Sequence, residues 1–334
     1  IVLCLYLSAG TAVMVAASPN IWLLGVSLTF MGLAAGLYHP AGLAFITRGV
    51  RQRSKALGYH GVAGNMGNFL APVLATAMVG MFNWRAAFLL MALISLGAAV
   101  SMQRSHLKDH KVISTSNDLM EGHDTETPVR WNKQLYLLPL IAVLGVNIIE
   151  GFIYRAIFTY LPLHFQENLH MEIFGLTPEV IGGMVTGIAL FFGAIGQYVG
   201  GLLGEKYPRE SVLLPMAIVM VPTLSIIGFT DGFLLIMAAS VFILFNFMAQ
   251  PSYGALIADY TPLHAQGRMF GITFALSMGI GSLGGVFGGW IAEAYGLTWV
   301  FPAIGLLTLA MVGLSVYIFL AAKTRTRLMA NALH

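Results

Sequence analysis

Glu150 and Arg155 lie five positions apart inside a long apolar segment of this chain. Charged side chains are costly inside a membrane, and those found there commonly mark a substrate or proton path. Glu150 can take up and release a proton, while Arg155 can attract an anion or favour the carboxylate. Five helical residues turn by about 140°, so a direct pair in one straight helix is awkward. The alternative is that Glu150 and Arg155 form a buried pair that only fixes helix packing. We favour the functional interpretation.

Other polar residues occur in apolar segments. His39 and His60 can titrate near neutral pH and could form a proton relay or gate, but hydrogen bonds to carbonyls freed by Pro40 or by glycines are the stronger interpretation. Asn246 and Gln250 share a helix face, where they either line a cavity or join helices. The predicted substrate and proton path therefore consists of Glu150, Arg155, Asn147, Tyr154, His39, His60, Asn246 and Gln250.

Enzyme chemistry fits these residues poorly. No carboxylate or cysteine accompanies the two histidines in their apolar segments, so a metal site is not expected. The chain also contains no HExxH, P-loop or GxSxG sequence. We therefore expect neither enzymatic activity nor a cofactor.

The elements that position these residues must be apolar helices. Of 334 residues, 57% are hydrophobic and 9% are charged, whereas a soluble domain carries about 25% charged residues. So few charges cannot cover a water-exposed surface, so most of the chain must face lipid or other buried helices. The formal net charge is +3, but the cationic residues lie mainly in short loops between apolar segments, so this charge does not indicate a nucleic-acid partner. The expected fold class is an all-α membrane protein.

Apolar segments long enough to cross a bilayer, which takes about 20 residues, occur ten times. If they alternate in direction, 15 of the 17 Lys and Arg residues lie in connections on one side. Positively charged loops stay in the cytoplasm, which places the C-terminus there. We expect a monomeric, multi-pass protein of a bacterial or archaeal cytoplasmic membrane. The predicted spans are 1–17, 21–47, 56–81, 84–102, 135–163, 180–204, 211–229, 233–258, 269–293 and 297–321.

An internal duplication relates the two halves of the chain. A basic loop between two apolar segments occurs at 36–72 and again, more weakly, at 251–285, about 213 residues later. The spans 135–163 and 180–204 have no counterpart in the first half, so we expect that two helices are missing before Ile1 and that the complete protein has two six-helix halves. The expected domains are a four-helix bundle at 1–102, a cytoplasmic linker at 103–134, a six-helix bundle at 135–322 and a cytoplasmic tail at 323–334.

Three motifs make the chain resemble the major facilitator superfamily. The first starts at Gly201 and reads GLLGEKYPR, which is similar to the family's loop signature G-x-L-A-D-R-x-G-R. Glu205, Lys206 and Pro208 replace Asp, Arg and Gly of that signature. The resemblance implies that Glu205, Lys206 and Arg209 clamp helix ends at the inner face.

The second motif lies in the segment 56–81. Gly58, Gly67 and Pro72 keep the spacing of the family's fifth-helix sequence G-x8-G-x3-G-P-x2-G-G, with alanine at 71 and 75. In the family this motif is associated with antiporters, so the resemblance implies export. The predicted conformational residues are Gly58, Gly67, Pro72, Gly201, Glu205, Lys206 and Arg209.

The third motif is Leu37-Tyr38-His39-Pro40, followed by the glycine-rich run 61–67, and it resembles fosmidomycin-resistance-type drug exporters. This sequence departs from the family's fourth-helix signature R-x-x-Q-G, because Leu28 and Met31 stand at the Arg and Gln positions. A mechanism that relies on that arginine is therefore not expected here.

The resemblance implies a two-bundle major-facilitator-type fold with about ten transmembrane helices present of an expected twelve. It also implies a secondary active transporter that moves a small molecule by alternating access. We expect proton-coupled export of a drug or other organic compound, with the substrate, the coupling proton and the lipid bilayer as partners. Two alternatives remain open: organic-anion uptake with Arg155 as the anchor, and a non-transporting sensor or assembly protein with the same fold.

Overall fold

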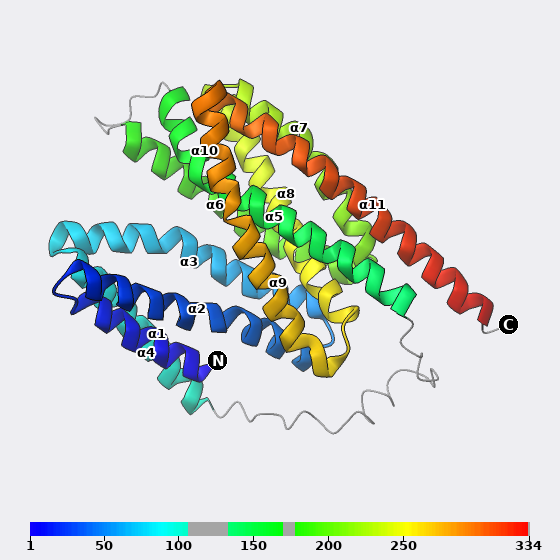
Figure 1. Cartoon of the computed structure of the whole chain (residues 1–334), viewed down its shortest axis with the longest axis horizontal. Helices are drawn as coiled ribbons and strands as arrows, with labels where there is room; N and C mark the ends of the chain where they lie inside the picture. The colour runs from blue at the N-terminus through cyan, green and yellow to red at the C-terminus, as the bar shows by residue number, and fades with distance from the viewer. Residues whose placement is uncertain (106–132, 170–177, 333–334) are drawn as a thin grey trace. The chain divides into compact units, whose positions relative to one another are not determined.

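The computed structural model describes residues 1–105, 133–169 and 178–332, and within these ranges the chain is helical apart from short turns (Figure 1). No strand occurs in these three ranges. The all-α prediction is therefore confirmed. The helices are α1 (Val2–Ala16), α2 (Ile21–Gly49), α3 (Arg53–Met81), α4 (Trp84–Arg104), α5 (Lys133–Asn168), α6 (Pro178–Lys206), α7 (Arg209–Phe229), α8 (Gly232–Asp259), η1 (Leu263–Ala265), α9 (Gln266–Gly281), α10 (Leu283–Tyr295), η2 (Leu297–Trp299) and α11 (Val300–Ala332).

Apolar length explains most of these helices. Eight helical segments of the described chain are long and apolar enough to cross a membrane, with α9 and α10 counted as one segment, Leu263–Tyr295. At 15 residues, α1 is shorter than a usual span, and α3 is not among the eight. Each of the ten predicted segments is nevertheless helical. The chain is an integral, multi-pass membrane protein.

Polar residues and glycines end the helices where the sequence has short connections. The Asn83 side chain caps α4 by accepting hydrogen bonds from the backbone N–H groups of Arg85 (2.9 Å) and Ala86 (3.2 Å). Gly232 and Gly296 have φ angles of +53° and +96°, which favour glycine, and they make the turns before α8 and η2. These turns bring consecutive helices back antiparallel.

The chain divides into two compact units, which we describe separately. The first contains Ile1–Gly42 and Ala71–Lys133, and in it α1 packs along α4. Its Arg85 side chain donates a hydrogen bond to the Ser18 carbonyl (3.1 Å). The second contains Leu43–Leu70 and Gln134–His334. Most of the expected linker 103–134 lies outside the described residues, and the expected domain boundaries stay predictions.

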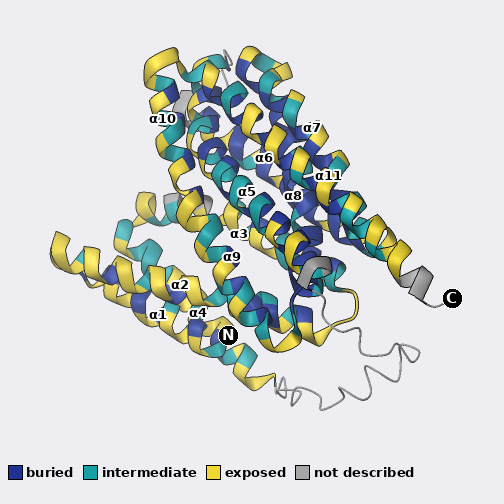
Figure 2. Cartoon of the chain, turned by 45° about the vertical axis from the view of Figure 1, so that its right-hand side comes forward, coloured by how far each residue is buried: buried dark blue, intermediate teal, exposed yellow. Residues whose placement is uncertain are grey.

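The second unit has an extensive core. α8 packs against both α6 and α7, and α7 also packs against α11. Figure 2 shows buried residues gathered along α5, α7 and α8. A Cβ atom at Gly196 or Gly200 would overlap the backbone of α8, so these glycines let α6 and α8 approach closely. Such contacts between small residues stabilise helix pairs in lipid.

Candidate functional site

The candidate proton site is Glu150, close to the middle of α5, where only 8% of the residue is exposed. Its Oε1 accepts a hydrogen bond from Gln250 Nε2 on α8 (3.0 Å). Gln250 Oε1 in turn accepts a hydrogen bond from Gln197 Nε2 on α6 (2.6 Å). We call Glu150, Gln250 and Gln197 the carboxylate–amide chain. It joins three helices of the second unit.

Two further polar groups of α8 face the same carboxyl group. Asn246 and Tyr253 lie near Glu150, and with Gln250 they occupy one face of α8. Neither Asn246 Nδ2 nor the Tyr253 hydroxyl has a hydrogen-bond partner in the described part of the chain. The surroundings of Glu150 are therefore neutral and polar, with donors available that can stabilise a carboxylate.

Arg155 is not brought to Glu150. Its side chain is exposed, and its guanidinium makes no hydrogen bond or ion pair with any residue that the structure describes. The five-residue separation along α5 turns the two side chains away from each other, as its helical geometry requires. Tyr154 lies against Phe158 (ring centroids 4.2 Å apart) and near Phe247 (6.3 Å). The predicted roles of Arg155 and Tyr154 stay predictions.

Asn147 and the two histidines take different positions. Asn147 is buried, and its side-chain Nδ2 donates to the Val143 carbonyl within α5 (2.9 Å). The backbone carbonyl of Asn147 accepts a hydrogen bond from the Ser277 hydroxyl of α9 (2.9 Å). His39 lies on α2 in the first unit, edge-on to Tyr38, whereas His60 lies on α3 in the second. The described residues contain no group of three His, Cys, Asp or Glu side chains that could hold a metal ion.

Gln197 and Tyr253 are not among the site residues predicted from the sequence. The sequence could not identify Gln197 as a site residue, because an isolated glutamine in an apolar segment does not indicate which helix its side chain contacts. Tyr253 had a usable signal, since it follows Asn246 by seven residues and therefore shares its helix face.

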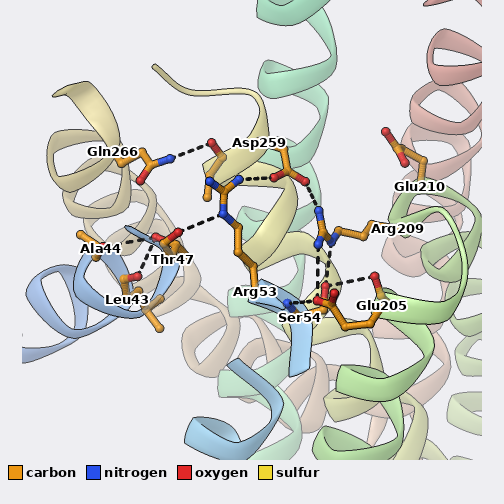
Figure 3. A network of polar contacts seen from close by, with 12 residues as sticks. Leu43, Ala44, Thr47, Arg53, Ser54, Glu205, Arg209, Glu210, Asp259 and Gln266 are labelled. Carbon is orange, nitrogen blue, oxygen red and sulfur yellow. Dashed lines mark hydrogen bonds and ion pairs between the residues drawn. The ribbon is translucent and has the colours of Figure 1, made fainter. Parts of the chain in front are cut away.

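A second polar cluster surrounds the beginning of α3, as Figure 3 shows. Glu205 Oε1, at the end of α6, accepts hydrogen bonds from the backbone N–H groups of Ser54 (2.6 Å) and Lys55 (3.4 Å). These N–H groups have no partner inside α3, and a carboxylate at a helix N-terminus is stabilised by the helix dipole. Glu205 therefore acts as a charged cap supplied by a different helix.

Two arginines extend this cluster to α8. Arg53 Nη1 contacts Asp259 Oδ1 (2.6 Å), and Arg53 Nε donates to the Thr47 carbonyl (2.9 Å). Arg209 bridges the other Asp259 oxygen, Glu205 Oε1 (3.4 Å) and the Ser54 hydroxyl (2.7 Å). We call Arg53, Ser54, Glu205, Arg209 and Asp259 the α3-end network.

The remaining predicted conformational residues differ in their surroundings. A Cβ atom at Gly58 would lie 2.7 Å from the Gln197 carbonyl oxygen and 3.0 Å from Gly201 Cα, so α3 and α6 cross closely at these two glycines. A Cβ atom at Gly67 would meet nothing within 4 Å. Lys206 Nζ lies over the Tyr207 ring (5.5 Å). The side chain of Pro72 lies outside the described residues.

A third cluster joins α7, the end of α8 and α11. Glu210 Oε1 accepts hydrogen bonds from the Tyr260 hydroxyl (2.8 Å) and from Arg325 Nη2 (3.1 Å). The Arg325 guanidinium also lies over the rings of Tyr260 (5.3 Å) and Tyr136 (5.6 Å). Burial, and then the charge on Glu210, raises the pKa of Tyr260 well above its ordinary value. Tyr260 therefore remains a neutral hydrogen-bond donor.

Comparison with known proteins gives a consistent result over most of the chain. A family model described as Major Facilitator Superfamily matches residues 1–176 and 168–329. An uncharacterized MFS-type transporter of Bacillus subtilis strain 168, YfnC, is 22% identical over 282 residues, which is 83% of this chain and 66% of YfnC. The multidrug resistance protein MdtG of Escherichia coli O1:K1 / APEC is 28% identical over 188 residues, 54% of this chain and 43% of MdtG. The chain thus spans less than two thirds of these relatives.

Two solved structures share the fold. The human organic anion transporter MFSD10 (TETRAN) superposes with a TM-score of 0.73 at 16% identity, covering 94% of this chain and 76% of that one. The E. coli fucose:proton symporter FucP superposes with a TM-score of 0.71 at 13% identity, covering 95% of this chain and 82% of FucP. At such identities the likeness concerns the fold, and it agrees with the two-bundle architecture expected from the sequence.

Proposed function

The chain belongs to the Major Facilitator Superfamily, and we propose that this transporter exports a small organic compound in exchange for protons, with Glu150 as the proton-binding group. The buried position of Glu150 carries the proposal. An ionisable group inside a membrane bundle is expensive, and Glu150 has no cationic partner among the described residues to compensate its charge.

The surroundings of Glu150 support both of its protonation states. Burial favours the neutral acid, whereas the hydrogen bond from Gln250 Nε2 favours the carboxylate. A group held between these two influences can bind and release a proton when its access to water changes. Alternating access provides such a change, because it opens a central site to each side of the membrane in turn.

Export is favoured over uptake by three observations. Gly58 of the antiporter-type glycine motif is required for the close approach of α3 and α6. One sequence relative, MdtG, is named as a multidrug resistance protein. The aromatic-His-Pro sequence at 38–40 resembles that of fosmidomycin-resistance-type exporters. The proposed exporter therefore belongs to this subgroup. Its proposed orientation places the C-terminus in the cytoplasm.

The test is gradient-driven transport by the full-length protein in proteoliposomes. With candidate organic compounds and an imposed pH gradient, Glu150→Gln should abolish movement driven by the gradient while binding or exchange remains measurable. Glu167→Gln is the matched control, since Glu167 lies exposed near the end of the same helix. Normal pumping by Glu150→Gln would refute the role of Glu150.

Organic-anion uptake is the second candidate, and the Arg155 guanidinium favours it, since it is exposed and has no ion-pair partner in the described part of the chain. MFSD10, one of the structural relatives, is titled an organic anion transporter. Here Arg155→Gln should remove transport of anionic compounds and leave that of neutral compounds intact. Inside-out vesicles then decide the direction, because an exporter fills them and an uptake system does not.

A further inference from the structure

The carboxylate–amide chain ends where α3 meets α6. A Cβ atom at Gly61 would overlap the side-chain amide of Gln197, so this amide lies directly against the backbone of α3. At Gly58 the contact continues to the Gln197 carbonyl oxygen (2.7 Å from a Cβ atom built there). Gln197 therefore touches α3 with both its side chain and its backbone, while it donates to Gln250 on the opposite side.

The face of α6 that carries Gln197 also carries the charged cap. Gln197, Gly201 and Glu205 follow one another at intervals of four residues, so they share one face of the helix. Gln197 contacts α3 at Gly61, Gly201 contacts it at Gly58, and Glu205 binds the N–H groups of its first turn. A change at Gln197 therefore acts on the helix crossing that the α3-end network also fastens.

The charge state of Glu150 fixes the direction of the hydrogen bonds. A carboxylate can only accept, so Gln250 must present its Nε2 to Glu150 and its Oε1 to Gln197. Gln197 must then present its Nε2 to Gln250, which leaves its Oε1 beside α3. Both hydrogen bonds are observed in this direction. An ionised Glu150 requires this direction, whereas a protonated Glu150 could accept in the same way and could also donate.

Protonation of Glu150 disturbs this order. The hydrogen bond from Gln250 loses its charge assistance, which makes it about half as strong. The new hydroxyl group can also donate to Gln250, but only if the Gln250 amide turns over and the Gln197 amide follows. The Gln197 amide cannot turn freely while it is pressed against Gly61.

We propose that Gln250 and Gln197 are positioning residues that link the protonation of Glu150 to the α3–α6 contact, so that the carboxylate favours the closed contact and the neutral acid favours its separation. The link rests on the proposed function only in taking Glu150 as the proton-binding group. Among the residues that the structure describes, the titratable groups that face Glu150 are Tyr253 on α8 and Tyr154 on α5, with the cation Arg155 beside Tyr154. Both tyrosines remain neutral hydroxyls over the pH range in which a carboxyl group titrates.

Spin labels on α3 and α6 test this link without depending on a substrate. The rings of Tyr59 and Tyr198 lie 5.9 Å apart on these helices, and both residues are exposed. Labels at Tyr59→Cys and Tyr198→Cys, with Cys4→Ser to remove the native thiol, report close approach by dipolar broadening at any pH. The ratio of close to separated labels should rise about fivefold from acid to alkaline pH, which is the effect expected when one hydrogen bond gains charge assistance and so about doubles in strength.

Three variants separate the link from a general effect of pH. Gln250→Met should make the ratio independent of pH, and Glu150→Gln should hold it at the acid value. Asn168→Leu is the matched control, since the Asn168 amide lies on α5 but does not belong to the carboxylate–amide chain and donates to the nearby His164 carbonyl. This variant should keep the full pH response. If Gln250→Met does not fold, Gln197→Met carries the same expectation.

The outcomes distinguish this link from the proposed function. A pH response that survives Gln250→Met, or a parent protein without any response, overturns the link whatever the transport assay gives. A response lost in Gln250→Met and kept in Asn168→Leu supports the link. If Glu150→Gln also pumps normally in that case, only the transport role of Glu150 is overturned.

Discussion

At the scale of single residues, the most informative feature is a small set of polar side chains that form hydrogen bonds between different helices of this protein. Gln250 donates to Glu150, Tyr260 donates to Glu210, and Arg209 donates to the Ser54 hydroxyl. An unpaired polar group in a bundle costs more than a paired one contributes, so each of these partners constrains where its helix lies.

The charged cap of α3 gives a prediction at this scale. Glu205→Gln keeps an acceptor near the Ser54 and Lys55 N–H groups but removes its charge and the ion pair with Arg209. The free energy of unfolding should fall by about 1 kcal/mol, and the effect should shrink at high salt. Thermal unfolding in detergent measures it. Glu293→Gln, at an exposed position of α10, should change stability by less than about 0.5 kcal/mol.

The sequence identified single residues better than it identified their partners. Glu150 and Gln250 both stood out as polar residues in apolar segments, yet nothing in one sequence says that α5 and α8 bring them within 3.0 Å. Arg155 also stood out, but the structure leaves it exposed and apart from Glu150. Contact between distant residues depends on helix packing, which apolar length does not encode.

At the scale of helices, the crossing of α3 and α6 depends on glycine. Gly58 and Gly201 face each other there, and Gly204 lies so close to Ser54 that a Cβ atom would approach its side chain to 2.8 Å. Glycines at intervals of three or four residues, as in this face of α6, let helices in a membrane pack backbone to backbone.

Two glycines of the same motif should respond in opposite directions to alanine. Gly58→Ala should destabilise the protein, since its Cβ atom would lie 2.7 Å from the Gln197 carbonyl oxygen, which belongs to the backbone and cannot move aside alone. Gly67→Ala has open space and should stabilise α3 by about 0.5–1 kcal/mol through helix propensity. Thermal unfolding of the two variants compares them. Equal effects would contradict the assigned crossing.

Helix positions were the most predictable part of the fold. Each predicted span lies on a helix because about 20 apolar residues must form one in a bilayer. The ends were less predictable, since α5 continues to Asn168 and α11 to Ala332, beyond the predicted limits at 163 and 321. The prediction also treated 269–293 as one helix, whereas the structure interrupts it at Ser282 between α9 and α10.

At the scale of the whole molecule, the polar clusters at the ends of α6, α7 and α8 hold helices together. Glu210, Tyr260 and Arg325 join three helices of the second unit. Folding raises the pKa of Tyr260 above its ordinary value of about 10, so its contribution is complete below that pH and is lost as the pH rises above it.

This dependence on pH gives a prediction for the complete protein. Tyr260→Phe removes a hydrogen bond to a charged acceptor and should lower the free energy of unfolding by about 1.5–3 kcal/mol near neutral pH. In alkaline solution the difference between the two proteins should shrink, because only the parent loses the contribution of the neutral phenol. Unfolding curves at a series of pH values measure this. A difference that grows with pH would contradict the raised pKa.

The account as a whole depends on Glu150 carrying the proton that drives transport. The most direct measurement compares uphill, gradient-driven movement with exchange of labelled for unlabelled substrate in the same proteoliposomes. In Glu150→Gln, uphill movement should fall to the background of empty vesicles while exchange continues, and Glu167→Gln should retain both. Uphill movement at the rate of the parent protein in Glu150→Gln would contradict the account.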